Sequence, residues 1–463
     1  MSRSFDAIII GAGQAGPSLA VRLGEAGMKV AIVERGLFGG TCVNTGCTPT
    51  KTLVASAHAA HLARRSAEFG VTLGGDVGVD MRRVKARQDA IVRAQREGVE
   101  QWVGGQPNCT VYKGHARFAS ARQIRVGDDL LTADRIFINV GGRANIPPLP
   151  GVDQVKVFTN SSLLALDDLP RHLVIVGGSY VGLEFAQIYR RFGAQVTVVE
   201  MGPRLIQRED PEVSATVLEI LQAEGVQFRL AAECIRFEPR GADVCVDVDC
   251  EIGDREVIGS HVLLAVGRRP NTDDLGLEAA GVEVDKRGYI VVDDALQTTA
   301  PGVWAVGDCN GKGAFTHTAY NDFEIVAANL LDGESRRVSD RIPAYALFID
   351  PPLGRVGLSE AQARATGKPL LVGTRPMTQV GRAVEKSETL GFMKVVVDAG
   401  TQEILGAAIL GTDGDEAIHG ILDTMYAKAN ARTLQRAMHI HPTVSELIPT
   451  LLGELKPLDP KTT

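Results

Sequence analysis

Residues 6–36 read DAIIIGAGQAGPSLAVRLGEAGMKVAIVERG: an apolar run, a glycine-rich turn, an amphipathic segment, a glycine and a second apolar run that ends at Glu34. This order predicts a β-strand, a helix and a second, parallel strand. In such a unit the first glycine makes the turn, the second lets the backbone approach a pyrophosphate, and the third lets the helix pack on the strand. Gly11, Gly13 and Gly16 occupy these places. The helix N-terminus then faces phosphates and Glu34 can accept hydrogen bonds from ribose hydroxyls, which indicates a dinucleotide site.

The same unit occurs a second time at residues 172–202, which read HLVIVGGSYVGLEFAQIYRRFGAQVTVVEMG. Four landmark residues of the first copy reappear with a constant shift of 166 positions, as Gly177, Gly182, Gly193 and Glu200. A single glycine fingerprint is a weak signal, because many such turns are glycine-rich for packing alone. Two copies, each between a strand and a helix and each followed by an acid, predict two dinucleotide-binding units.

The two copies differ at the middle glycine position, where the second copy has Ser179 in place of Gly13. The serine adds a Cβ and a hydroxyl where the backbone would approach the ligand, so we expect weaker binding or a shifted geometry there. Glu200 disfavours the 2′-phosphate of NADP by like-charge repulsion, which favours NADH. Arg204 lies nearby and keeps NADPH open as the alternative.

The composition is that of an ordinary globular protein, with 44% hydrophobic and 23% charged residues. The chain has 463 residues, enough for about three domains of roughly 150 residues each. The net charge is −7 and there is no basic run, so we expect no nucleic-acid partner. No apolar run reaches the ~18 residues of a membrane helix, and the first predicted strand begins at Ala7, leaving no room for a signal peptide. We therefore expect a cytoplasmic protein without a membrane partner.

Residues 39–51, GGTCVNTGCTPTK, place Cys42 and Cys47 five positions apart. A plant-type iron–sulfur site would need a third cysteine where Thr50 stands, and no further zinc ligands follow at short spacing. A structural disulfide across so short a loop would gain little. A redox pair fits better, because a helix predicted over 50–65 places Cys47 near a helix N-terminus, which favours a thiolate. Lys51 lies one helical turn further on and can share a face with Cys47.

Four more segments follow in a fixed order: INVGGRANIPPLPG at 138–151, LLAVGRRPNT at 263–272, TTAPGVWAVGDCNG at 298–311 and HPTVSE at 441–446. Together with the cysteine segment they resemble the flavoprotein disulfide reductases, the group of dihydrolipoamide dehydrogenase, glutathione reductase and mercuric reductase. The resemblance covers essentially the whole chain. It implies an α/β fold with two Rossmann-like dinucleotide-binding domains, for FAD and NAD(P), and a C-terminal α+β dimerisation domain.

The resemblance also implies domain boundaries and a homodimer. The first part of the FAD domain would span 1–150, the NAD(P) domain 151–270, the returning FAD or central segment 271–340 and the dimerisation domain 341–463. FAD would occupy the first nucleotide site and NAD(P)H, with NADH favoured, the second.

Residue by residue, the resemblance implies that Cys47 faces the flavin and that Cys42 is the outer thiol, which attacks the substrate. Lys51, paired with Glu184, would lie near the flavin. His441, held by Glu446, would be the acid–base group and would come from the partner subunit. Tyr180 would cover the flavin until the nucleotide enters, and Asp308 would contact the ribitol. Further cofactor contacts are expected from Thr41, Ala116, Gly141, Thr316, Gly267 and Arg268.

The histidines leave one choice open from the sequence alone. His439 lies two residues before His441, and only the neighbouring Pro442 and Glu446 favour the latter. His58 and His61 are three residues apart on the helix after the cysteines. We interpret them as part of a solvated helical face, and we predict no metal site.

The electron acceptor is expected to be a small disulfide or a related thiol-reactive compound. Mercury(II) or another soft metal ion is the alternative, but the sequence has no cysteine after Cys309 and no N-terminal metal-binding module, and it retains His441 and Glu446. A base above Cys42 suits the cleavage of a sulfur–sulfur bond. A flavoprotein without a redox disulfide would leave Cys42 and Cys47 without a role, and an FAD-loaded structural subunit would not be reduced by NADH.

Overall fold

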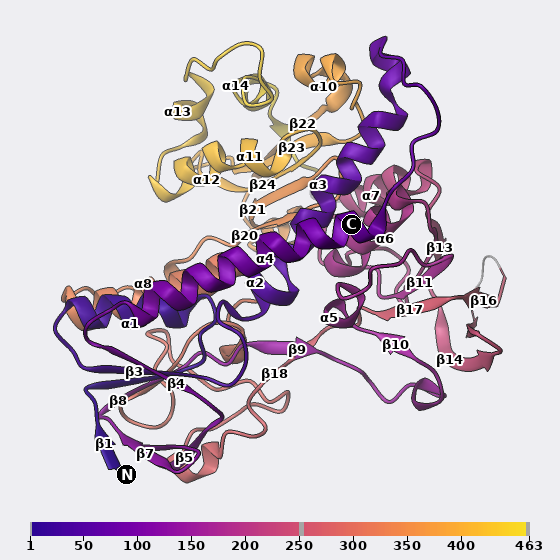
Figure 1. Ribbon diagram of the computed structural model, residues 1–463. Coiled ribbons are helices and arrows are strands. Elements are labelled where there is room, and N and C mark those ends of the chain that lie inside the picture. The colour runs from indigo at the N-terminus through magenta and orange to yellow at the C-terminus, as the bar shows by residue number, and fades with distance from the viewer. Residues whose placement is uncertain (1, 250–253, 460–463) are drawn as a thin grey trace.

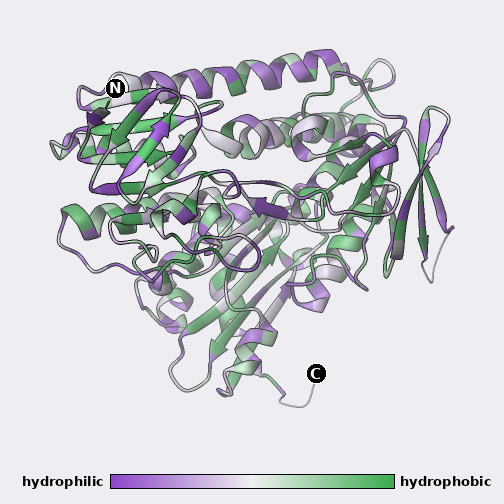
Figure 2. Ribbon diagram, turned by 90° about the horizontal axis from the view of Figure 1, so that it is seen from below, coloured by the Kyte–Doolittle hydropathy of each residue, from purple (hydrophilic) through white to green (hydrophobic). Residues whose placement is uncertain are grey.

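The computed structural model describes residues 2–249 and 254–459. Three bodies are visible in Figure 1: a first sheet with its helices near the N-terminus, a second sheet in the middle of the chain, and a C-terminal sheet with short helices. Figure 2 shows that apolar residues concentrate in the strands, whereas the outer helices carry many polar residues. No helix of the described residues is long and apolar enough to cross a membrane.

The first body is built on a five-stranded parallel sheet with the order β19-β8-β2-β3-β4. Its strands are β2 (Ala7–Ile10), β3 (Val30–Glu34), β4 (Cys109–Lys113), β8 (Arg135–Ile138) and β19 (Val303–Ala305). Helices α1 (Ala15–Glu25) and α8 (Thr316–Leu331) pack against each other beside it. A second sheet, β1-β7-β6-β5, covers this body further; its strands are β1 (Ser2–Ser4), β5 (Ala116–Ser120), β6 (Gln123–Val126) and β7 (Asp129–Thr132).

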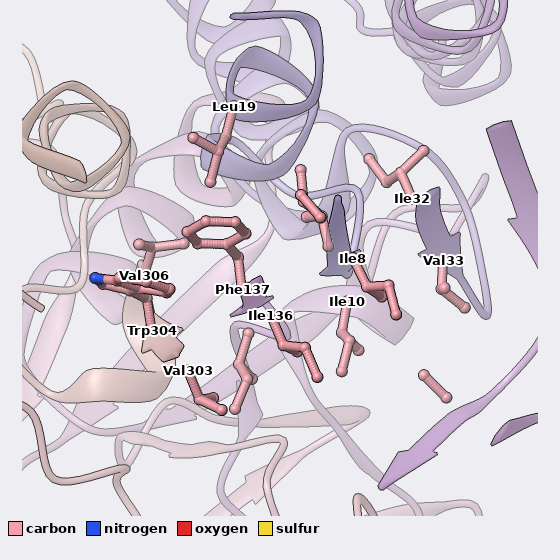
Figure 3. Close-up of a cluster of buried hydrophobic side chains, with 14 of the residues drawn as sticks. Ile8, Ile10, Leu19, Ile32, Val33, Ile136, Phe137, Val303, Trp304 and Val306 are labelled. Carbon is pink, nitrogen blue, oxygen red and sulfur yellow. The ribbon is translucent and has the colours of Figure 1, made fainter. Parts of the chain in front are cut away.

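The core of the first body joins segments that lie far apart in the sequence. Phe137 and Trp304 stack with ring centroids 5.0 Å apart, and Leu19 of α1 points toward the Phe137 ring (Figure 3). The strand at 303–305 therefore returns to complete the sheet that the first 140 residues begin.

The second body repeats this design with the parallel order β10-β17-β11-β12-β13. Its strands are β10 (Val157–Phe158), β11 (His172–Val176), β12 (Gln195–Val199), β13 (Gln227–Arg229) and β17 (His261–Leu264). The helices are α5 (Asn160–Leu163), α6 (Tyr180–Phe192) and α7 (Pro211–Ala223), and an antiparallel sheet is formed by β14 (Glu233–Arg240), β15 (Asp243–Asp249) and β16 (Glu256–Gly259). The short antiparallel pair β9 (Gly142–Ala144) and β18 (Arg268–Pro270) joins the two bodies (Figure 1).

The C-terminal body is a six-stranded antiparallel sheet with the order β20-β21-β24-β23-β22-β25. Its strands are β20 (Ala344–Leu347), β21 (Leu353–Gly357), β22 (Leu370–Pro376), β23 (Phe392–Asp398), β24 (Ile404–Leu410) and β25 (Lys456–Pro457). The helices are α9 (Glu360–Ala365), α10 (Gly381–Glu385), α11 (Gly414–Ala417), α12 (His419–Tyr426), α13 (Ala431–Gln435) and α14 (Leu447–Gly453). The predicted fold class, two Rossmann-like units and a C-terminal α+β unit, is confirmed. The boundaries at 150, 270 and 340 stay a prediction.

Two consecutive helices follow the first βαβ unit and link the bodies. Helix α3 (Cys47–Arg64) packs on α6, and α4 (Met81–Gly104) packs on α3 and reaches α1 (Figure 1). The helix predicted over 50–65 begins three residues earlier, so Cys47 is its first residue. Cys42 lies in a separate short helix, α2 (Gly40–Thr45).

Candidate active site

The first glycine turn is shaped by steric contacts that exclude side chains. Gly11 has a φ of +103°, and a Cβ there would lie 2.3 Å from the carbonyl oxygen of Asn139. A Cβ on Gly16 would lie 2.2 Å from the carbonyl oxygen of Gly11. The Glu34 carboxylate accepts hydrogen bonds from the backbone N–H groups of Ala12 and Gly36, both at 2.7 Å. Strand, turn and acid thus form one rigid unit, as a dinucleotide cradle requires.

The second glycine turn has the same construction. Gly177 has a φ of +117°, and a Cβ there would lie 2.5 Å from the carbonyl oxygen of Ala265. Glu200 accepts hydrogen bonds from the backbone N–H groups of Gly178 at 2.6 Å and Gly202 at 2.8 Å. Ser179 has extended backbone and immediately precedes α6. The two copies seen in the sequence therefore share the same hydrogen bonds, from two backbone N–H groups to the glutamate at the end of the second strand.

One large cavity of about 1270 Å³ connects the first glycine turn with the cysteines. The predicted site residues that line it are Gly11, Gly13, Glu34, Thr41, Cys42, Cys47, Lys51, Ala116, Gly141, Tyr180, Glu184, Arg268, Asp308 and Thr316. The predicted site residues that do not line this cavity are Gly16, Gly177, Ser179, Gly182, Glu200, Gly267, His441 and Glu446. A long cavity with a glycine turn and the thiols in its walls fits an extended dinucleotide whose redox ring reaches Cys47. Burial raises the pKa of Asp308 in this wall.

The two cysteines have opposite acid–base properties. Cys47 is exposed to the cavity, whereas Cys42 is half-buried, and both are thiols in this structure. The hydrogen bond from the Cys42 thiol lowers the pKa of Cys47 to about 6, helped by the Thr316 hydroxyl and the charge of Lys51. The same hydrogen bond, together with burial, raises the pKa of Cys42 far above its ordinary value. At neutral pH the pair therefore holds one thiolate, on Cys47, and one thiol, on Cys42.

Besides the Cys42 thiol, the Thr316 hydroxyl and the Lys51 ammonium stabilise the charge of the Cys47 sulfur, whereas the charge of Glu184 opposes it and raises the pKa of Cys47. The Thr316 Oγ1 lies 3.2 Å from the Cys47 Sγ. Lys51 Nζ forms an ion pair with Glu184 Oε2 at 2.5 Å and lies 4.4 Å from the centre of the Phe348 ring. The other Glu184 oxygen accepts a hydrogen bond from the Phe348 N–H at 3.1 Å. The predicted pairing of Lys51 with Glu184 is present, and it joins α3 to α6 and to the C-terminal body.

The C-terminal histidine motif lies on the surface of its own body. His441 Nδ1 and Glu446 Oε2 are 2.8 Å apart, and the histidine side chain is 81% exposed. The Nδ1 of His439 lies 3.2 Å from the carbonyl oxygen of Ala437, and no carboxylate of the described residues contacts this histidine. The carboxylate partner therefore distinguishes His441 from His439 and leaves its Nε2 free to face another molecule.

His58 lies on a partly solvated face of α3, with its side chain 41% exposed, but it also has a partner that the sequence did not indicate. Its Nδ1 lies 2.7 Å from Asp350 Oδ2, and that hydrogen bond raises the pKa of His58. Arg191 donates to the same carboxylate oxygen at 2.6 Å. The sequence carries no signal for this contact, because Asp350 arrives from the C-terminal body. Within the residues that the structure describes, no group of three or more His, Cys, Asp or Glu side chains could hold a metal ion.

Two further polar residues near the site were not predicted, Glu209 and Tyr345. The Glu209 carboxylate accepts hydrogen bonds from the hydroxyls of Tyr180 and Tyr345. Neither residue belongs to a motif, and they come from different bodies of the molecule.

Two family models match most of the chain. Residues 5–322 match the model described as pyridine nucleotide-disulphide oxidoreductase, and residues 343–452 match the dimerisation domain of the same family. The chain belongs to the pyridine nucleotide-disulphide oxidoreductases. This family uses FAD and NAD(P)H, so the predicted family, enzyme class and cofactors are confirmed, and the Cys42–Cys47 pair fits its redox-active disulfide.

Several relatives within the family are similar over nearly their full length. A probable pyridine nucleotide-disulfide oxidoreductase, RclA of Escherichia coli, is 36% identical and aligns over 98% of this chain and 99% of its own. The dihydrolipoyl dehydrogenase of Thermus scotoductus is 33% identical with 96% of each chain covered, and a mercuric reductase of Streptomyces lividans is 32% identical with 96% and 94% covered. A solved structure of the Cu(II) complex of RclA from Escherichia coli superposes with a TM-score of 0.88 at 35% identity, covering 97% of this chain and 99% of that one.

Proposed function

We propose that this oxidoreductase passes electrons from NADH, through the flavin and the Cys42–Cys47 disulfide, to a small disulfide or a related thiol-reactive acceptor. The observation that carries the proposal is the position of Cys47 in the cavity that begins at the first glycine turn, where the Cys42 thiol and the Thr316 hydroxyl lower its pKa. When bound, the flavin supplies the two-electron step between a nicotinamide hydride and the cysteine disulfide. A reducing compartment such as the cytoplasm suits a cycle that ends in free thiols.

The opposite pKa shifts assign different roles to the two sulfurs. Cys42, once deprotonated, attacks a sulfur of the acceptor, so that one mixed disulfide forms and the first thiolate leaves. The Cys47 thiolate then attacks the Cys42 sulfur, which closes the Cys42–Cys47 disulfide and releases the second thiolate. The first leaving thiolate takes up the proton that Cys42 gave to its base, and the second takes up a proton from water. Cys42 needs a base because its pKa is raised, whereas Cys47 needs none.

We assign the base to His441, with Glu446 as the group that orients it. An imidazole can take the Cys42 proton and return it to the leaving thiolate near neutral pH. His441 does not line the cavity of its own chain and is exposed, which supports a position above Cys42 of the partner subunit. The match of residues 343–452 to the family's dimerisation domain supports the homodimer.

The second glycine turn would hold the nicotinamide nucleotide. Gly177, Ser179 and Gly182 would face the pyrophosphate, and Gly267 and Arg268 would flank the entrance. Glu200 is fixed by two backbone N–H groups beside the expected ribose, which supports NADH over NADPH. Tyr180 lies in the cavity wall between this turn and Cys47, where it would cover the flavin.

The residues of the first site are assigned by their place in the cavity wall. Gly11, Gly13 and Gly16 would form the pyrophosphate turn, and Glu34 would bind ribose. Thr41, Lys51, Ala116, Gly141, Asp308 and Thr316 would contact the rest of FAD.

A metal ion is the second candidate acceptor, since mercuric reductases and a Cu(II) complex of RclA are among the similar proteins. Mercury(II) or copper(II) would be bound by the thiol pair, because thiolates are soft ligands. A half-buried thiol at Cys42 that requires a base suits disulfide cleavage better.

An anaerobic titration with NADH tests the proposed route. A working pair takes up two electrons for the disulfide in addition to two for the flavin, and the Cys47 thiolate beside the flavin gives a long-wavelength absorbance band. Cys47→Ala should abolish that band, and a band that survives would refute the assignment. A steady-state panel of lipoamide, oxidised glutathione, mercury(II) and copper(II), with NADH and with NADPH, then identifies the acceptor. Turnover of the metal ions alone would favour the second candidate.

A further inference from the structure

A buried carboxylate connects two tyrosines in the wall of the cavity. Glu209 is only 2% exposed, and its Oε1 accepts hydrogen bonds from the Tyr180 hydroxyl at 3.0 Å and the Tyr345 hydroxyl at 2.6 Å. Tyr180 is the first residue of α6 in the second body, whereas Tyr345 belongs to β20 of the C-terminal body. Two donors from different bodies therefore share one acceptor atom.

The rings of these two tyrosines pack against each other and, through Tyr345, against Phe315. The rings of Tyr180 and Tyr345 meet edge to face with centroids 5.6 Å apart, and Tyr345 stacks on Phe315 at 5.7 Å. All three side chains line the cavity that contains Lys51 and Cys47. A nicotinamide ring that reaches the flavin from the second glycine turn would have to displace Tyr180, because Tyr180 directly follows this turn and lines the cavity.

The carboxylate itself is held in place by its loop. The Ile206 N–H donates to the carbonyl oxygen of Gly178 in the second glycine turn at 3.0 Å, and the Glu209 N–H donates to the carbonyl oxygen of Ile206 at 2.8 Å. Arg355 Nη1 lies 3.8 Å from Glu209 Oε2, a longer contact than a hydrogen bond. Glu209 is therefore a fixed acceptor, and movement of Tyr180 changes its hydrogen bonding.

We propose that Glu209 holds Tyr180 in the closed position and that Tyr345 keeps Glu209 hydrogen-bonded when Tyr180 swings out. Both act as positioning residues for nucleotide entry, and the inference rests on the proposed function of the second site. In the closed state Glu209 has two tyrosine donors, and in the open state it has one. A buried carboxylate without a donor is costly, so Tyr345 makes opening easier although it does not move.

This arrangement predicts effects of opposite sign for two similar substitutions. Tyr180→Phe removes the donor that is lost on opening, so the open state becomes more populated and NAD⁺ should bind about three- to tenfold more tightly. Tyr345→Phe leaves the open carboxylate without a tyrosine donor, so NAD⁺ should bind about three- to tenfold more weakly. In the double variant, opening no longer changes the number of donors, so Tyr345→Phe should have no effect in the Tyr180→Phe background.

The experiment measures the dissociation constant of NAD⁺ for the FAD-loaded full-length enzyme, by calorimetry and by the change in flavin absorbance. Tyr189→Phe is the matched control, because Tyr189 lies in the same helix, its hydroxyl donates to the carbonyl oxygen of Leu163, and it does not line the cavity. The control should bind NAD⁺ like the unchanged enzyme. Glu209→Gln, which keeps an acceptor oxygen but removes the charge, should tighten binding less than Tyr180→Phe.

Effects of the same sign for Tyr180→Phe and Tyr345→Phe, or an undiminished Tyr345→Phe effect in the double variant, would overturn the inference. Failure of the proposed function looks different: the unchanged enzyme would then bind neither NAD⁺ nor NADP⁺ and its flavin would not be reduced by NADH or NADPH. If only NADP⁺ binds, the same series of variants is titrated with NADP⁺.

Discussion

The Thr316 hydroxyl should account for a large part of the acidity of Cys47. Its Oγ1 lies 3.2 Å from the Cys47 sulfur. When Cys47 is a thiolate, only the hydroxyl can donate this hydrogen bond. Thr316→Val keeps the shape of the side chain and removes the donor, so it isolates the contribution of one hydrogen bond.

The size of the effect follows from the charge of the acceptor. A hydrogen bond to a charged group contributes about 1.5–3 kcal/mol, and one pKa unit corresponds to about 1.4 kcal/mol. The pKa of Cys47, about 6 in the unchanged enzyme, should therefore rise by about 1–2 units in Thr316→Val. At pH 7 the thiolate fraction should fall from about nine-tenths to between about one-half and one-tenth.

The assay is a pH titration of the long-wavelength band in enzyme whose disulfide has been reduced, with the alkylation rate of Cys47 as an independent measure. Thr48→Val is the matched control, because Thr48 is the next residue after Cys47 and its hydroxyl donates to Gln95 Oε1 at 2.6 Å. The control midpoint should not move. If the titration midpoint of Thr316→Val lies within about 0.3 pH unit of the midpoint of the unchanged enzyme, the reasoning is refuted, since the expected shift is several times larger.

Three other substitutions test separate parts of the scheme. Gly11→Ala should abolish flavin retention, because its φ is +103° and the new Cβ would lie 2.3 Å from the Asn139 carbonyl oxygen; a purified variant with full flavin absorbance would contradict this. Lys51→Met should lower the free energy of unfolding in urea by about 1–2 kcal/mol, because Glu184 stays buried without its cation. The loss is smaller than in a fully buried pair because Lys51 is one-third exposed. An unchanged urea concentration at the midpoint of unfolding would contradict this prediction. His441→Gln should slow the reaction with a disulfide acceptor by about 100-fold or more without slowing flavin reduction by NADH. Stopped-flow absorbance measures the two steps separately, and slow flavin reduction with a normal acceptor step would contradict the assignment.

The fold could be predicted because its decisive features are local. The glycines at 16 and 182 are required by backbone approaches within each turn, to the carbonyl oxygens of Gly11 and Gly177, and the strands and helix around them have strong hydrophobic patterns. The position of Cys47 at a helix start was also local, although the helix begins three residues earlier than expected. The pairing of Lys51 with Glu184 came from the resemblance, since 133 residues separate them.

The remaining contacts could not be predicted because they depend on which distant segments meet. Helical periodicity shows which residues share a face with His58, but it does not indicate that Asp350, 292 residues later, packs on that face. Glu209 likewise contacts Tyr345 across 136 residues. Neither carboxylate stands in a motif, so only the three-dimensional arrangement of the bodies reveals their roles.

The contacts between the bodies bear on how the nucleotide reaches its site. Arg191 of α6 is 4% exposed and donates to Asp350 of the C-terminal body, and Lys394 of β23 lies 3.7 Å from Asp210 at the start of α7. Separating the second body from the third would break both of these ion pairs at once. Rotation of Tyr180 breaks one hydrogen bond, to Glu209, and the contacts of its ring with Phe315, Tyr345 and Arg208. Because the side-chain movement costs far less than the domain movement, we expect nucleotide entry to proceed by displacement of Tyr180 between bodies that stay in place.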